Sequence, residues 1–211
     1  WHKGILSDVC DVIAGYAFKS KDFTDSGTPV IKIKNIASDK TVDVEDVVRV
    51  EHPPANLSDK FKLESGTLLM AMTGATVGKY GLLVNKDGRH SLLNQRVAKL
   101  EAKQGTTDNS LVWFIYCALS ECGIYDFIVN AAYGSAQPNI SAGMIGSGPI
   151  VVPPQTLVQE FNSVVNGSFQ KILLNRKTTF VLEDLRDSLL PKLLSGQITI
   201  PNAEQQLAEV L

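Results

Sequence analysis

Residues 149–196 read PIVVPPQTLVQEFNSVVNGSFQKILLNRKTTFVLEDLRDSLLPKLLSG, and the spacing of the apolar residues changes within this stretch. Up to Pro153 the chain consists of short β-branched runs separated by turn residues. After Pro154 the apolar residues recur every three or four positions over 157–194, which is the period of an amphipathic helix. About 35 such residues make a helix of about 50 Å, too long for a domain of this size to cover, so we expect a partner helix. The positions expected to pack in that interface are Phe161, Val165, Phe169, Ile172, Leu182, Leu185, Leu189 and Leu193.

Polar and helix-breaking residues subdivide this helical stretch. Asn175 falls near the middle of the apolar positions, where a polar residue lowers stability but can fix the register or the choice of partner. Pro191 and the pair Ser195-Gly196 mark where the helix kinks or ends. The expected organisation is a globular domain over 1–153, a helical spacer and dimerisation helix over 154–198, and a C-terminal tail over 199–211.

The first 153 residues predict short strands and one long helix. β-Branched runs at 30–36, 42–50, 67–72, 79–84 and 92–100 are typical of strands, and 149–152 is expected to return to the sheet. Alternation within 30–36 would place Lys32 and Lys34 on one face of a strand. Residues 111–130 are apolar and free of proline, which predicts a helix capped by 108–110. The fold class expected is α+β: a mixed α/β domain with a twisted sheet, followed by a long coiled-coil-forming helix.

Composition and charge limit the classes of protein that are possible. The chain has 211 residues, of which 44% are hydrophobic and 20% charged, and this excludes disordered and collagen-like classes. The formal net charge is −2, but residues 65–100 carry five Lys or Arg and a His against one acidic residue. Such a basic stretch is equally compatible with a solvated face and with a phosphate-contacting patch.

Several features indicate where the protein works. The three cysteines form no CxxC pair, which favours a reducing compartment, and we expect a cytoplasmic protein. The start, WHKG, has neither an initiator Met nor the apolar core of a signal peptide, so an internal piece of a longer chain is expected. No apolar run approaches the length of a membrane span, and no membrane partner is expected.

Motifs for catalysis are weak. The Pro-Pro pairs in 52–55 and 152–155 lack the flanking residues of a base-methylating motif. Residues 74–80 are one residue short of a phosphate-binding loop and place Tyr80 where its Ser or Thr belongs. The three histidines lie far apart with no ligand at metal-binding spacing. We therefore expect neither an active site nor a metal site.

A series of short motifs runs through almost the whole chain in a specific order. They are LSDVCDVIAG at 6–15, GTPVI at 27–31, GTLLM at 66–70, NQRV at 94–97, GSAQPNI at 134–140, PIVVPP at 149–154 and LLPKLLSGQI at 189–198. Together they resemble one half of a specificity (S) subunit of a type I restriction-modification system.

The resemblance implies a target recognition domain and a helical spacer. Members of that family carry two such halves in tandem, each reading one half of a split DNA target. The subunit is not catalytic: it binds double-stranded DNA and docks a methyltransferase subunit, which a restriction subunit joins. S-adenosylmethionine, ATP and Mg are then expected on the partner subunits, and no cofactor in this chain. Because only one half is present, the chain is expected to be either a fragment or a half-length subunit that forms a homodimer. The motif at 189–198 resembles the C-terminal end of such subunits, so a fragment would be the C-terminal one.

Candidate DNA contacts are selected by chemistry, because Lys and Arg meet phosphates while Asn, Gln and Arg read base edges. Asn94 and Gln95 are as compatible with hydrogen bonding to a neighbouring loop as with DNA contact. Gln137 is also compatible with a structural turn. Lys32, Lys34, Lys79 and Arg96 are the first choices for phosphate contacts. The full set is Lys32, Lys34, Thr73, Thr76, Lys79, Arg89, Asn94, Gln95, Arg96, Tyr133, Ser135 and Gln137.

Two other functions remain open from the sequence. The chain could be the recognition domain of an S-adenosylmethionine-dependent DNA methyltransferase, whose catalytic domain would lie elsewhere. It could also be an adaptor that assembles through a coiled coil.

Overall fold

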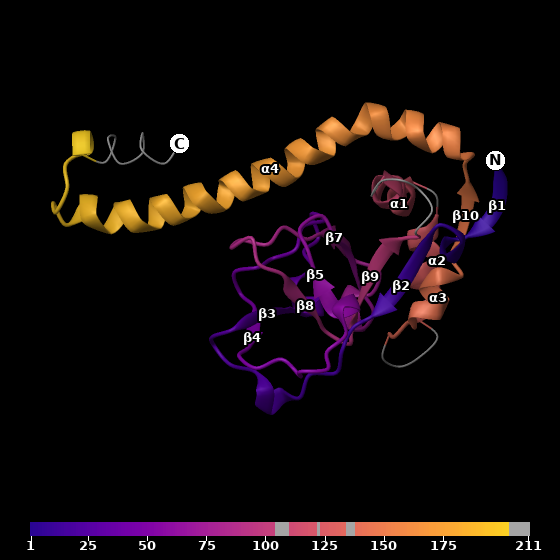
Figure 1. Cartoon of the computed structure of the whole chain (residues 1–211), viewed down its shortest axis with the longest axis horizontal. Helices are drawn as coiled ribbons and strands as arrows, with labels where there is room; N and C mark the ends of the chain where they lie inside the picture. The colour runs from indigo at the N-terminus through magenta and orange to yellow at the C-terminus, as the bar shows by residue number, and fades with distance from the viewer. Residues whose placement is uncertain (104–109, 122, 134–137, 203–211) are drawn as a thin grey trace. The chain divides into compact units, whose positions relative to one another are not determined.

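The computed structural model describes residues 1–103, 110–121, 123–133 and 138–202. The chain divides into two compact units, Trp1–Gln170 and Lys171–Leu211. Figure 1 labels the helices and strands. The first unit holds the strands and the helices α1 (Ser110–Glu121), α2 (Ile124–Ala132) and α3 (Ala142–Gly146). Helix α4 (Gln155–Leu194) contributes its first turns to the first unit and its remainder to the second.

A sheet that we call the first sheet has the order β2-β9-β6-β7. Its strands are β2 (Cys10–Ala14), β9 (Val97–Ala102), β6 (Leu68–Ala71) and β7 (Tyr80–Leu82), and every neighbouring pair is antiparallel. All four residues of β6 are buried, as expected for a central strand with both faces covered. Helix α1 contacts β9 and buries Ile115 and Leu119 completely, so the main core lies between this helix and the first sheet.

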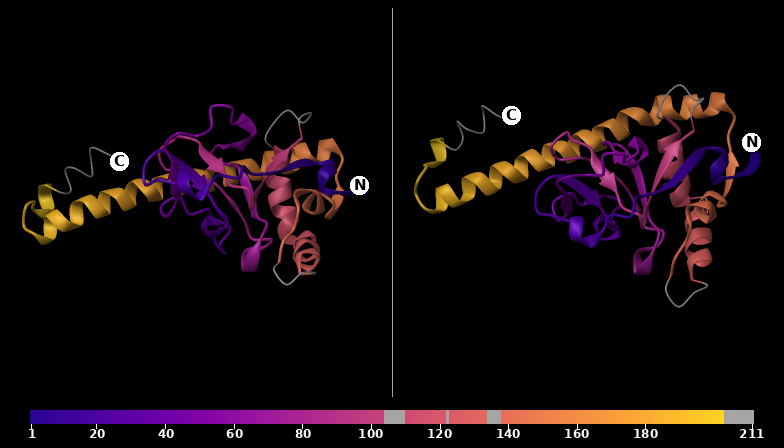
Figure 2. Two further views of the ribbon diagram at one scale, coloured as in Figure 1. Left: turned by 90° about the horizontal axis from the view of Figure 1, so that it is seen from below. Right: turned by 60° about the horizontal axis from the view of Figure 1, so that its bottom comes forward.

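The second sheet has the order β4-β3-β8-β5. It consists of β4 (Val48–Val50), β3 (Thr28–Ile31), β8 (Ser91–Leu93) and β5 (Lys62–Leu63). Strands β3 and β8 are parallel, so both end at the same edge, whereas the other pairs are antiparallel. Figure 2 shows these purple and indigo strands on one side of the first unit and the salmon helices on the other.

Short elements complete the first unit. Strands β1 (His2–Ile5) and β10 (Pro149–Val152) form a separate antiparallel pair. Five short 3-10 helices lie between strands in the described residues: η1 (Leu6–Asp8), η2 (Ser20–Asp22), η3 (Ile33–Asn35), η4 (Asp59–Phe61) and η5 (Gly74–Thr76).

The α+β class and the long helix are confirmed, but several expected element boundaries are wrong. The helix expected over 111–130 is two helices, bent by 68°. Gly123 adopts φ +69°, a left-handed conformation that an α-helix cannot continue through. The expected cap at 108–109 lies outside the described residues. Strand β10 pairs with β1 rather than with either larger sheet.

The strand expected over 30–36 ends at Ile31, so Lys32 and Lys34 do not share a strand face. Buried Asn35 is the cause: its Oδ1 accepts the Lys32 N–H at 2.9 Å, and its Nδ2 donates to the Asp46 carbonyl at 2.8 Å. These bonds hold the chain in the turn η3. The strand expected over 42–50 is likewise shorter and contains only β4.

The strand expected over 92–100 is two strands that belong to different sheets. The residues between them, 94–96, form a turn in which the Val97 N–H donates to the Asn94 carbonyl at 2.9 Å. The same turn brings the Asn94 N–H to the Ile31 carbonyl at 3.2 Å. Residues 94–96 therefore connect the two sheets.

Candidate functional site

Polar residues from three segments meet at one end of the first sheet. Ala71 at the end of β6 pairs with Val97 at the start of β9, and the Met72 N–H donates to the Arg96 carbonyl at 2.9 Å. The Ala71 N–H also donates to the Lys79 carbonyl at 2.8 Å, immediately before β7. We call this end the polar edge. It comprises Thr73, Thr76, Lys79, Gln95 and Arg96, all of them selected from the sequence.

The side chains of the polar edge are available for contact. Gln95 and Arg96 are exposed, and Lys79 is half-buried with its Nζ 3.0 Å from Ser38 Oγ. Neither cation has a carboxylate partner in the part of the chain that the structure describes. Thr76 Oγ1 donates to the Thr73 carbonyl at 3.2 Å, whereas Thr73 Oγ1 is buried without a hydrogen bond. Cations and amides arranged in this way can contact phosphate oxygens and base edges.

Glycine makes the turn of the polar edge possible. Gly78 has φ +81°, and a Cβ there would lie 3.0 Å from a Val129 methyl and 3.2 Å from the Tyr125 ring. Helix α2 therefore packs directly on the turn that carries Thr76 and Lys79. A side chain at position 78 would strain the backbone and push this helix away.

Lys40 ties the strand beside the polar edge to helix α1. Its Nζ donates to Ser120 Oγ at 2.7 Å and lies 5.3 Å from the centre of the Tyr80 ring. The Tyr80 hydroxyl is 2.6 Å from the same Ser120 oxygen. The hydrogen bond with Tyr80 raises the pKa of the Lys40 ammonium above its usual value, with a smaller effect from Tyr116. These contacts fix the start of β7, and with it the position of Lys79.

Asn94 is placed differently from its neighbours. Its side chain is only 6% exposed, and its Oδ1 is 3.5 Å from the Arg96 N–H. Its backbone connects the two sheets. Asn94 thus supports the turn, while Gln95 and Arg96 project from it.

The remaining candidates from the sequence lie outside the polar edge. Lys32 Nζ sits over the Phe23 ring at 4.8 Å, and Lys34 is ion-paired with Asp46 at 2.7 Å. Arg89 is exposed in the loop before β8. It therefore lies at the opposite end of that strand from Asn94. Tyr133 is 61% exposed at the end of α2. Ser135 and Gln137 lie outside the described residues.

The expected helix-packing positions divide between the two units. In the first unit Phe169 stacks on Trp113 and Phe161 meets the Phe114 ring edge-on, so both pack on α1. In the second unit Leu189 is buried, and Leu185 and Leu193 are half-buried. Val165, in the first unit, is also half-buried. Positions that remain exposed are Ile172, Asn175 and Leu182.

A second group of residues, not predicted from the sequence, lies on the second sheet. Tyr16, Phe18 and Phe23 pack against Val30 and other buried side chains of that sheet. The Tyr16 ring meets Phe18 at 4.9 Å and Phe61 at 5.8 Å between ring centres. The available signal was the dense aromatic spacing of 16, 18 and 23, each close to a lysine.

The described residues also bear on metal binding and membrane insertion. Among the described residues no group of three or more His, Cys, Asp or Glu could hold a metal ion. No single described helix is long and apolar enough to cross a membrane; only α1 and α2 taken together, despite their bend, meet the length and composition test.

Comparison with known proteins shows strong family similarity. Residues 1–178 match the model of the type I restriction modification DNA specificity domain. The chain is 26% identical over 207 residues to the type I restriction enzyme MjaIX specificity subunit of Methanocaldococcus jannaschii, covering 95% of this chain and 45% of that subunit. It is also 26% identical over 205 residues to the type I restriction enzyme HindI specificity subunit of Haemophilus influenzae, covering 94% and 42%.

Solved structures show the same fold at lower identity. The S subunit of a type I restriction-modification system from M. genitalium aligns with a TM-score of 0.56 at 19% identity, over 90% of this chain and 45% of that one. A second structure, of a type I system described by its complex assembly and conformational transition, aligns with a TM-score of 0.55 at 16% identity, over 91% and 45%. The chain thus spans about half the length of the curated relatives it matches.

Proposed function

Because the chain belongs to the type I restriction modification DNA specificity family, we propose that it is a DNA sequence-recognition module of a type I restriction-modification enzyme. It reads one half of a split target and directs methylation and cleavage there without catalysing either. The family match over residues 1–178 carries this proposal, because it includes both sheets and the first turns of α4. In this assignment, 1–153 is the recognition domain, 154–198 the spacer helix and 199–211 a tail.

The polar edge supports DNA as the ligand. Lys79 and Arg96 have no carboxylate partner among the described residues, so each can neutralise a phosphate and release a condensed counterion. Gln95 is exposed beside Arg96 and has the donor and acceptor needed to read a base. We assign Lys79 and Arg96 to phosphates, and Gln95 to a base edge.

The family assignment also implies the partners of this chain. A methyltransferase subunit that uses S-adenosylmethionine docks on the assembly, and an ATP- and Mg-dependent restriction subunit joins through it, in the cytoplasm. The exposed apolar side chains Ile172 and Leu182 on α4 pack against a second copy of this chain or the helix of a second half. A methyltransferase recognition domain is less favoured, because the named relatives are specificity subunits.

Selection from a library of random duplexes tests this function. The chain should bind DNA weakly alone, because a single domain of net charge −2 makes few phosphate contacts, and tightly and selectively with the methyltransferase subunit. One half-site motif should emerge from the selection. Nanomolar specific binding by the isolated chain at physiological salt would contradict the proposal that a partner is required. Binding of labelled S-adenosylmethionine to the chain alone would favour the methyltransferase reading, and a complex without sequence preference would favour the adaptor.

A further inference from the structure

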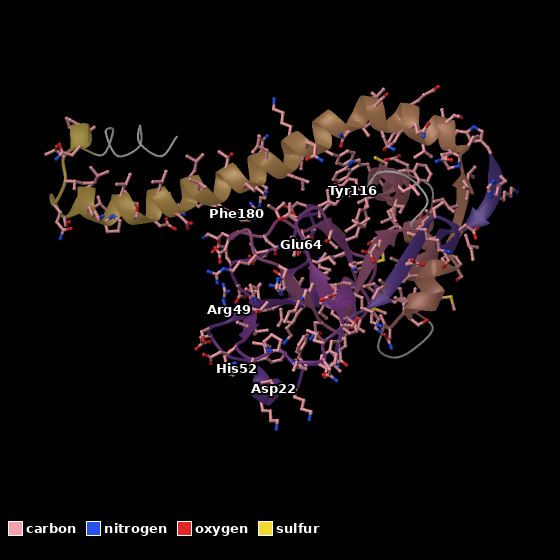
Figure 3. All side chains as sticks on the ribbon, in the orientation of Figure 1. Asp22, Arg49, His52, Glu64, Tyr116 and Phe180 are labelled. Carbon is pink, nitrogen blue, oxygen red and sulfur yellow. The ribbon has the colours of Figure 1, made fainter. Side chains whose placement is uncertain are left out.

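The cover of the second sheet is a second surface that continues from the polar edge. A small core of Val30, Val50, Leu92 and Phe18 lies on one face of that sheet. Tyr16, Phe23 and Leu57 lie over this core and are only partly buried. We call the partly buried aromatic residues Tyr16, Phe23 and Phe61 the aromatic cover. Asp22, labelled in Figure 3, is the exposed last residue of η2 in this region.

Tyr16 joins the aromatic cover to the polar edge. Its carbonyl accepts the Gln95 N–H at 2.9 Å, and its N–H donates to the Leu93 carbonyl at 2.9 Å. Its ring contacts Phe18 and Phe61. The aromatic cover and the turn that carries Gln95 and Arg96 are therefore neighbours at Tyr16.

Two lysines are held on this surface by ring contacts. Lys32 Nζ lies 4.8 Å from the centre of the Phe23 ring, and Lys60 Nζ lies 5.0 Å from the centre of the Phe61 ring. A ring face attracts the ammonium group without using its N–H donors as a carboxylate does, so these donors remain free for phosphate oxygens.

Ion pairing separates these lysines from others in the same unit. Lys34, Lys62, Lys86 and Lys99 each have a carboxylate oxygen within 3.1 Å of Nζ. Within the described ranges no such partner is found for Lys32 or Lys60. Lys62 already takes the Asp59 carboxylate, at 2.7 Å, beside Lys60.

Exposed lysines on η2 add to the positive charge of this surface. Lys19 and Lys21 flank Ser20 on the exposed side, although Asp22 and Asp25 follow them. Lys19, Lys21, Lys32 and Lys60 outnumber Asp22 and Asp25, so these residues together carry a positive charge. A positively charged surface favours an anionic ligand such as the phosphates of DNA.

We propose that Lys32 and Lys60 on the aromatic cover form a second phosphate-contacting surface for the same DNA duplex that the polar edge reads. This inference rests on the proposed function and extends it, because it identifies which further residues hold the DNA. The surface contributes affinity and orientation but no base preference.

The double variant Lys32→Met with Lys60→Met tests the surface. Methionine keeps an aliphatic chain on each ring and removes only the charge, so the thermal unfolding midpoint should not change. Binding of the assembly with its methyltransferase subunit to a fluorescent duplex of arbitrary sequence is measured between 50 and 200 mM salt. Each lost phosphate contact lowers the slope of log affinity against log salt by about 0.9, so the double variant should lose roughly 30-fold in affinity at 0.15 M salt.

Two controls make the result specific. Lys103→Met removes an exposed charge just after the far end of β9 and should leave the slope unchanged. The double variant Lys32→Arg with Lys60→Arg keeps both charges and should retain the original slope. An unchanged slope for the Met variant, together with a reduced slope for Lys79→Ala, would refute this surface and leave the proposed function standing. If neither the unmodified assembly nor any variant selects a DNA sequence, the proposed function fails as well.

Discussion

The indole of Trp113 on α1 stacks on the Phe169 ring of α4, with ring centres 4.3 Å apart and planes 6° from parallel. Trp113 Nε1 also donates to Asn166 Oδ1 at 3.3 Å. Tyr116, labelled in Figure 3, meets Phe169 at 5.5 Å and Tyr80 at 5.7 Å between ring centres. A continuous series of aromatic contacts thus runs from Phe169 of α4 to the strand that follows Lys79. The part of α4 up to Gln170 is therefore packed into the first unit.

We predict that Phe169→Ala lowers the free energy of unfolding by about 3 kcal/mol, because a large buried ring leaves a cavity between α1 and α4. Urea unfolding followed by tryptophan fluorescence measures the change. The matched control is Gln170→Ala, at the next position of α4, where the side chain is exposed and the cost should stay within about 0.5 kcal/mol. Equal effects of the two substitutions would contradict the packing role of Phe169.

Asn94 and Gln95 are expected to respond in opposite ways. Asn94→Ala should cost about 1 to 2 kcal/mol in unfolding free energy, because a buried amide in the turn between sheets is lost. Gln95→Ala should leave stability unchanged and alter the base preference found by duplex selection. A change in base preference without loss of stability in Asn94→Ala would show that Asn94 touches DNA.

Lys79→Ala should weaken binding of the assembly about equally for all sequences and lower the salt slope by roughly one. Arg96→Ala should likewise weaken binding of both specific and arbitrary sequences, because it removes a second phosphate contact. Titrations on the selected duplex and on a scrambled one, between 50 and 200 mM salt, measure both effects. An unchanged slope for Lys79→Ala would remove it from the phosphate contacts.

The exposed apolar residues of α4 predict self-association of the chain. Light scattering at micromolar concentration should give a dimer mass, and Leu182→Asp should dissociate it, because a carboxylate buried in an apolar interface costs several kcal/mol. Ser188→Asp, about 120° around the helix, adds the same charge and should leave the dimer intact. Asn175→Leu should keep the dimer but loosen its register. A monomeric mass for the unmodified chain, with α4 still protected from hydrogen exchange, would refute self-association.

Cys10 should make stability depend on alkaline pH. Burial, with a smaller contribution from Asp11, raises the pKa of its thiol from 9.0 to about 12. The folded chain therefore binds this proton more tightly than the unfolded chain. The resulting stabilisation is complete below about pH 9 and is lost as the pH rises toward 12. Urea unfolding from pH 8 to 11 should show a steeper decline for the unmodified chain than for Cys10→Ala; parallel declines would contradict the prediction.

Local pattern alone determined several elements. The three-to-four-residue spacing after Pro154 predicted the helix that the structure has as α4, and short β-branched runs predicted β6 and β7. Strands β6 and β7 are buried along their whole length, whereas α4 buries Phe169 and Leu189 and leaves Ile172 and Leu182 exposed. The sequence pattern therefore predicts the type of each element, and only for the strands does it also follow burial. The order of motifs such as GTLLM and NQRV likewise identified the family.

Boundaries set by single residues were not predictable in this way. Gly123 divides one apolar stretch into α1 and α2. The turn at 94–96 divides one β-branched run into β8 and β9, which belong to different sheets. Apolar residues continue on both sides of Gly123, and the strand run is interrupted by only three polar residues, 94–96. What ends each element is a left-handed glycine or a hydrogen bond to a distant strand, and the hydropathy pattern does not identify either one.

The candidate site depended most on tertiary structure. The sequence identified Thr73, Thr76, Lys79, Gln95 and Arg96 by chemistry, but only strand pairing places them at one edge. Sequence also treats Lys32 and Lys34 alike, whereas the fold pairs Lys34 with Asp46 and sets Lys32 over Phe23. Whether a lysine is free to bind a phosphate depends on which distant carboxylate or ring folding brings within a few ångströms. The number of residues between two positions does not determine the distance between their side chains, because packing between segments sets that distance.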